Sequence, residues 1–71
     1  MTDQPHAGLS EAIESLLYVS GEPVPMDMLV RATERTKREV MAALDGLERG
    51  LRDGQRGLRL LRLPEGVQLI S

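Results

Sequence analysis

The hydrophobic pattern of the chain changes its period at Asp53-Gly54, and this change limits the folds open to the chain. Before that point apolar residues recur every three or four positions, as they do on the buried side of a helix. After it, GLRLLRL (57–63) and VQLIS (67–71) flank Pro-Glu-Gly, which is typical of two short strands joined by a tight turn. We therefore expect helices up to residue 54 and a C-terminal β-hairpin.

The first two helices are short, and turn residues delimit them. The first is predicted to begin at an N-capping Ser10, to reach about Val19 and to stop at Gly21. The second is predicted to start at Pro25, which is pre-set for a first helical turn, and to end near Thr33. The side of the first helix that faces the core is expected to carry Leu9, Ile13, Leu16 and Ser20, flanked by Ala12 and Leu17.

The third helix has the strongest local signals. Thr36 and Glu39 fit a capping box, in which each side chain bonds the backbone N–H of the other residue. Four apolar residues then form one stripe, Val40, Leu44, Leu47 and Leu51. Three helices followed by a hairpin indicate a mainly α fold, a winged helix-turn-helix with the hairpin as its wing. We expect residues 9–71 to form this domain and residues 1–8 to be a flexible tail.

Residue types that commonly act in catalysis or bind metal ions are scarce in this chain. The 71 residues include no cysteine, and His6, the one histidine, lies in the predicted tail. We find no phosphate-binding glycine loop and no spacing of metal ligands. The sequence also shows no signal peptide and no apolar run long enough for a membrane span. We therefore expect a soluble cytoplasmic protein that is not an enzyme and has no cofactor.

Charge is unevenly distributed along the chain. Residues 1–30 contain five acidic residues and no lysine or arginine, whereas residues 31–63 contain all nine basic residues and five acidic ones. Two interpretations are open: an ordinary solvated surface, or a module that meets a charged partner with its basic half.

Tyr18 is the only aromatic residue, and it falls on the wrong side of its helix for the core. At about 100° per residue it lies about 180° from Leu9. It either packs on a neighbouring loop with its hydroxyl in water or belongs to a contact surface.

The predicted hairpin is apolar on both faces, whatever its turn. A two-residue turn would divide the apolar residues into Leu58, Leu60, Val67 and Leu69 on one face and Leu61, Leu63 and Ile70 on the other. A three-residue turn would instead divide them into Leu61, Leu63, Val67 and Leu69 against Leu58, Leu60 and Ile70. A free-standing hairpin keeps one face polar, so a partner subunit or residues beyond Ser71 are expected to cover the second face.

Nucleic-acid binding is the alternative that this architecture suggests. Arg38, Arg49 and Arg52 lie on the predicted third helix, opposite its apolar stripe, and could touch phosphates or base edges. Asp45 lies among them, however, and the chain is acidic overall with a net charge of −2.

The segment SLLYVSGEPVPMDMLV (15–30), the capped third helix and the two hairpin segments together resemble the N-terminal domain of segregation and condensation protein B, ScpB. The resemblance covers nearly the whole chain after residue 8. It implies the N-terminal half of a longer protein with two winged-helix domains, a non-enzymatic subunit of the bacterial SMC–ScpA–ScpB condensin complex.

The resemblance also implies partners and a place in the cell. The implied partners are a second copy, which gives a homodimer, and the kleisin ScpA, which connects the dimer to SMC. The implied role is chromosome condensation and segregation during the cell cycle, near the nucleoid, with DNA contacted indirectly. The residues that we expect to bind partners are Tyr18, Leu61, Leu63 and Ile70. The alternative is the DNA-binding winged-helix domain of a transcription regulator, which would use Arg38, Arg49 and Arg52.

Overall fold

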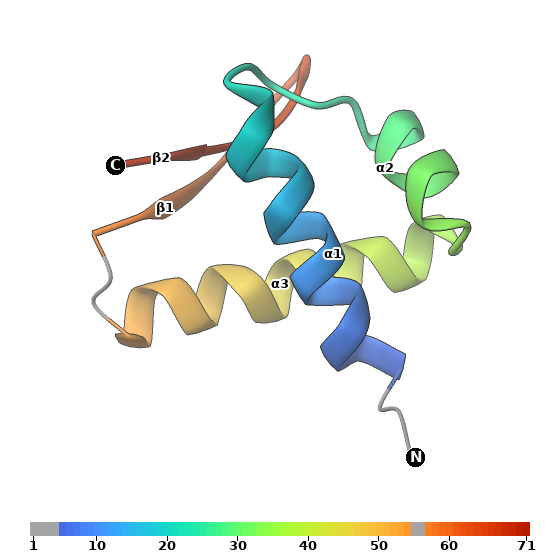
Figure 1. The fold of residues 1–71 in the computed structure, drawn as a ribbon, viewed down its shortest axis with the longest axis horizontal. Helices are drawn as coiled ribbons and strands as arrows, with labels where there is room; N and C mark the ends of the chain where they lie inside the picture. Colours follow the sequence, from blue (N-terminus) through green and yellow to red (C-terminus); the bar gives the residue numbers. More distant parts are fainter. Residues whose placement is uncertain (1–4, 55–56) are drawn as a thin grey trace.

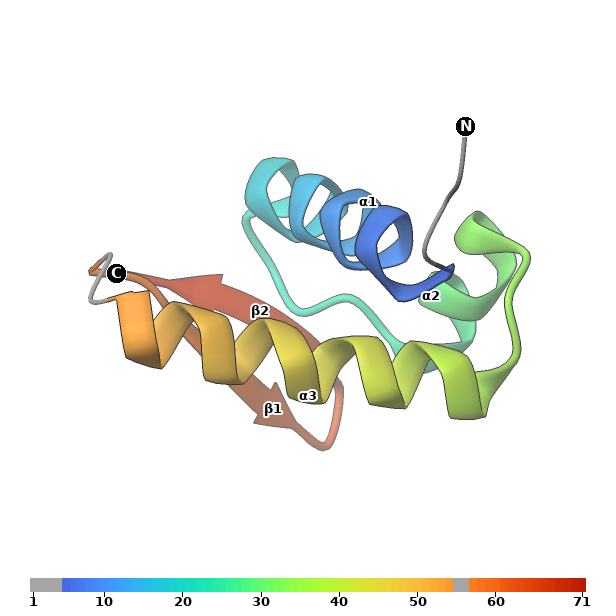
Figure 2. The same cartoon turned by 90° about the horizontal axis from the view of Figure 1, so that it is seen from below.

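The computed structural model describes residues 5–54 and 57–71 and confirms the predicted winged helix-turn-helix (Figure 1). The elements are α1 (Pro5–Ser20), α2 (Met26–Thr33), α3 (Lys37–Gly54), β1 (Arg59–Leu63) and β2 (Gly66–Ile70). α1 lies across α3, α2 packs against both helices at one end, and the hairpin lies on the other side, with β1 against α3 and β2 against α1 (Figure 2).

α1 begins at Pro5, so the predicted start at Ser10 is wrong. Proline is favourable in a first helical turn for two reasons. Its fixed φ suits the helix, and the backbone N–H that it lacks would have no hydrogen-bond partner within the helix at that position. The predicted tail is therefore wrong for residues 5–8, which are helical, while residues 1–4 lie outside the described residues. The buried stripe is Leu9, Ile13 and Leu17, at intervals of four; Leu16 packs against the core and is partly buried, and Ser20 does not continue the stripe. α1 does stop at Gly21, where φ is +73°.

α2 and α3 follow the sequence predictions closely. Pro25 is extended with ψ 149° and precedes the first residue of α2 instead of forming its first turn. The predicted capping box of α3 is present: the Glu39 N–H donates to Thr36 Oγ1 at 3.1 Å, and the Thr36 N–H donates to Glu39 Oε1 at 2.9 Å. All four residues of the predicted stripe are buried, namely Val40, Leu44, Leu47 and Leu51.

The strands β1 and β2 pair antiparallel with a two-residue turn. Leu63 is opposite Gly66, which leaves Pro64 and Glu65 as the turn, so the two-residue alternative is correct and the three-residue one is wrong. A third segment joins β2, because Val24 and Val67 exchange two backbone hydrogen bonds of 2.8 and 2.9 Å. The linker between α1 and α2 is thereby fixed to the wing.

Gly66 is required at the point where this linker crosses the hairpin. Its φ is +153°, and a Cβ built there would lie 2.5 Å from the carbonyl carbon of Val24 and 2.8 Å from the nitrogen of Pro25. Both the backbone conformation and the contact therefore exclude a side chain.

We predict that Gly66→Ala lowers the free energy of unfolding by about 2 kcal/mol or more, because the methyl group would push the linker off β2. Gly46→Ala is the matched control, since a Cβ on Gly46 meets nothing within 4 Å and alanine favours a helix. Urea denaturation followed by circular dichroism measures both variants. Equal stability of Gly66→Ala and the unmodified chain would contradict the close approach of the linker.

Candidate partner-binding surface

The inner face of the hairpin closes the core of the domain. Leu60 and Val67 are 8% and 4% exposed, and the partly buried Leu58 and Leu69 pack against the same core. These four residues are the set that the two-residue turn places together. The inner face is therefore fully used for folding.

The outer face of the hairpin has no cover within the described part of the chain. Leu61 is 36% exposed, and Leu63 and Ile70 are half-buried. The register places these three side chains on one face, because their positions alternate with those of Leu60 and Val67. Three aliphatic side chains on the solvent side of a two-stranded sheet form a surface suited to contact with another chain.

The end of α1 presents a second exposed apolar pair. Tyr18 is 72% exposed and Val19 is 77% exposed. At that exposure Tyr18 does not pack on a neighbouring loop of the described chain, and its part in a contact surface stays a prediction. The sequence analysis did not identify Val19 as an exposed residue. Its position in the last turn of the helix, beyond the buried Leu17, could have indicated this exposure.

A side chain of the outer face reaches the residue that follows α1. Gln68 is opposite Leu61 on the outer face, and its Nε2 donates a hydrogen bond of 3.4 Å to the carbonyl oxygen of Gly21, directly after α1. The end of α1 accordingly lies next to β2 (Figure 1). We name the combined region the α1–wing surface and define it by Tyr18, Val19, Leu61, Leu63 and Ile70.

The three candidate DNA-contacting arginines do not form one cluster. Arg38, Arg49 and Arg52 are all exposed. At about 1.5 Å of rise per residue, the first and the last of them are about 21 Å apart along α3. In the described segments none of the three takes part in an ion pair.

The wing and α3 are joined by Arg62. Its Nη2 lies 2.7 Å from Oδ1 of Asp45 and 3.5 Å from Oε1 of Glu48. Asp45 thus pairs with a residue of β1 and not with Arg49, the neighbour one helical turn away. The pairing holds an acidic group in the middle of the outer face of α3, which is unfavourable for a helix that approaches phosphates.

The described residues contain no group of three or more histidine, cysteine, aspartate or glutamate side chains able to hold a metal ion. Nor does any helix within 5–54 have the length and apolar character that crossing a membrane requires.

The chain is similar to known proteins over most of its length. The family model described as segregation and condensation complex subunit ScpB matches residues 11–71. The segregation and condensation protein B of Clostridium acetobutylicum is 32% identical over 59 residues, which cover 83% of this chain and 29% of that protein. The chain therefore spans less than a third of the length of this curated relative.

Solved structures share the fold. The crystal structure of ScpB from Mycobacterium tuberculosis matches with a TM-score of 0.87 and 28% identity, over 99% of this chain and 44% of that one. A conserved hypothetical protein from Chlorobium tepidum matches with a TM-score of 0.80 and 26% identity, over 93% and 42% of the two chains. A dimer of an ScpB N-terminal domain complexed with an ScpA peptide matches with a TM-score of 0.84 at 22% identity, over 90% and 80%.

We predict that Arg62→Ala lowers the free energy of unfolding by about 0.2–1 kcal/mol, because the ion pairs that it removes are largely exposed. The loss should shrink at high NaCl concentration, which screens exposed charges. Arg49→Ala, which removes an arginine without an ion pair among the described residues, should change the stability by less than about 0.5 kcal/mol. Urea denaturation at low and at high salt tests this, and equal effects of the two variants would contradict a structural role for Arg62.

Proposed function

The chain belongs to the family of the segregation and condensation complex subunit ScpB, and on this basis we propose that it is a non-enzymatic assembly module of the bacterial SMC–ScpA–ScpB condensin complex. The module associates with a second copy of itself and so helps to build the complex that condenses and segregates chromosomes. Its place in the cell is the cytoplasm, at the nucleoid.

The α1–wing surface is the observation that carries the self-association proposal. It exposes an aromatic and several aliphatic side chains on a domain whose apolar inner face is already used. Burying one such side chain fully is worth about 1.5–3 kcal/mol, so a few of them suffice for the core of an interface. A symmetric dimer would place the same surface of both copies together and cover it on both.

Membership of the family supports the partners that we propose for this module. The structural relative that is an ScpB N-terminal domain was crystallised as a dimer with an ScpA peptide. We propose that the present chain likewise forms a homodimer, binds the kleisin ScpA and contacts SMC through it. DNA would then be reached through the complex. The proposed whole protein has two winged-helix domains, of which this chain supplies the N-terminal one.

DNA binding by a transcription regulator is the alternative function. The exposed Arg38, Arg49 and Arg52 favour it, while their separation along α3 and the acidic Asp45 between them weaken it. No asparagine or glutamine, the residues that read adenine in the major groove, lies in α3.

We predict that Tyr18→Glu and Leu61→Glu each weaken the homodimer at least about tenfold, because each buries a charge in the interface. Met28→Glu is the control: Met28 is 49% exposed but lies on α2, away from the α1–wing surface, so its dimer should be unchanged. Sedimentation equilibrium over a range of concentrations measures the dissociation constants. A Met28→Glu effect as large as that of Leu61→Glu would contradict the assignment of the surface.

A double variant distinguishes the proposed assembly function from the alternative of DNA binding. We predict that Arg38→Ala combined with Arg49→Ala leaves the dimer and the binding of ScpA within about twofold of the unmodified chain. Fluorescence anisotropy with a labelled DNA duplex tests the alternative. If the unmodified chain binds DNA with a strong salt dependence and this variant loses that binding, the transcription-regulator function is favoured instead.

A further inference from the structure

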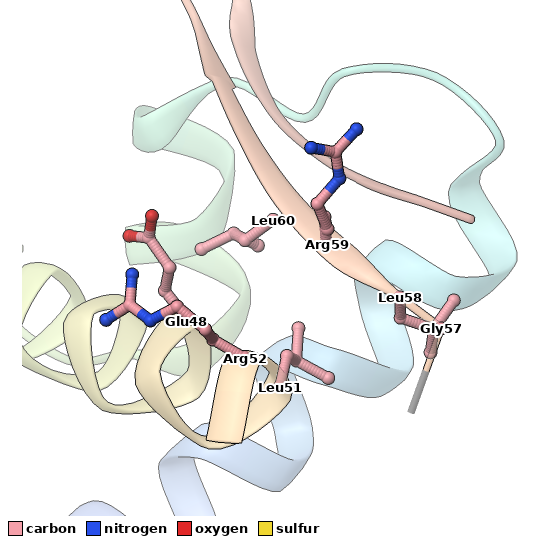
Figure 3. Close-up of a pocket in the computed structure, with 7 residues that line it drawn as sticks. All are labelled: Glu48, Leu51, Arg52, Gly57, Leu58, Arg59 and Leu60. Carbon is pink, nitrogen blue, oxygen red and sulfur yellow. The ribbon is translucent and has the colours of Figure 1, made fainter. Parts of the chain in front are cut away.

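The outer face of the hairpin carries a positive charge at its open end. The register places Arg59 on this face, directly opposite Ile70. Figure 3 shows the guanidinium of Arg59 on the side of β1 away from Leu51, whereas Leu60 points from the same strand towards α3. Arg59 is exposed and takes part in no ion pair within the described residues. Its charge is therefore available to a group of another chain.

The turn end of the same hairpin is acidic. Glu65, in the turn, and Asp27, in the first turn of α2, line one hollow together with Leu63 of the outer face. Both acidic residues are exposed, and neither takes part in an ion pair in the part of the chain that the structure describes. The strand rises about 13 Å over the four residues from Arg59 to Leu63. Opposite charges thus lie at opposite ends of one apolar face.

Two copies can stack their outer faces with two-fold symmetry and aligned strands in two ways. If the strands of the two copies run in the same direction, Arg59 lies near Arg59 of the second copy. If they run in opposite directions, Arg59 of each copy lies near Glu65 of the other. Stacked sheets are about 10 Å apart, which an arginine and a glutamate side chain can span together. Like charges repel across an interface, so the charge pattern favours the second arrangement.

We propose that the homodimer stacks its two wings antiparallel, with two symmetric ion pairs that join Arg59 of each copy to Glu65 of the other. Asp27 adds to the negative potential at each pair. Leu61, 36% exposed, lies midway between Arg59 and Leu63 on β1, so this stacking brings the Leu61 side chains of both copies together near the two-fold axis. The inference rests on the proposed self-association, to which it adds the orientation of the copies and the residues that select it.

Charge-reversal variants test the orientation. Arg59→Glu and Glu65→Arg each replace two attractions in the homodimer with two repulsions, so each should weaken it about tenfold. An equimolar mixture of the two variants should form a heterodimer, because both pairs then join opposite charges again. The double variant, Arg59→Glu with Glu65→Arg, should recover the homodimer for the same reason. Sedimentation equilibrium measures the dissociation constants, and native mass spectrometry distinguishes the heterodimer from the homodimers.

Arg49→Glu is the matched control, since it makes the same charge change on α3, which packs on the inner side of the hairpin. It should weaken the homodimer less than about twofold, and its mixture with Glu65→Arg should not favour a heterodimer. High NaCl concentration should reduce the effect of Arg59→Glu, because it screens exposed charges. Circular dichroism melting of each variant confirms that it folds.

Equal effects of Arg59→Glu and Arg49→Glu would overturn the proposal, as would a mixture of Arg59→Glu and Glu65→Arg that forms no favoured heterodimer. A heterodimer of Arg59→Glu with Glu22→Arg instead would place Arg59 against the linker between α1 and α2 of the second copy, which also overturns it. The unmodified chain keeps the two proposals apart. If it stays monomeric, both self-association and the orientation fail, whereas a dimer that is insensitive to Arg59→Glu and Glu65→Arg contradicts the orientation alone.

Discussion

The structure depends on the packing of one face of the hairpin against the helices. Leu60 and Val67 close the core above α3 and α1, and Val24 fixes the linker to β2 through two backbone hydrogen bonds. Because side chains alternate along a strand, burying this face forces Leu61, Leu63 and Ile70 outward. The exposed apolar surface that we assign to self-association is thus a direct consequence of how the core is closed.

Polar contacts also tie the wing to the helices. Gln68 of β2 donates a hydrogen bond to the carbonyl oxygen of Gly21, directly after α1. Arg62 engages Asp45 and Glu48 and so links β1 to α3.

Local signals made much of the fold predictable. The capping box at Thr36 and the leucine stripe of α3 depend on residues three or four apart, so both could be read from the chain. The helical period alone indicated that Tyr18 points away from the core, while its exposure became clear from the structure. The predicted start of α1 at Ser10 is wrong because Pro5 and Ser10 are both residues that begin helices, and the hydrophobic period does not distinguish between them. The bridge of Val24 to Val67, the pairing of Arg62 with Asp45 and the meeting of the α1 end with the wing join distant residues, and no periodicity reveals them.

Self-association is the central claim, and the molar mass of the unmodified chain tests it most directly. Light scattering across a concentration series should show the mass rising from 7.8 kDa towards twice that value as the dimer forms. A mass that stays at 7.8 kDa up to the highest soluble concentration would contradict the claim that the α1–wing surface joins two copies of this chain.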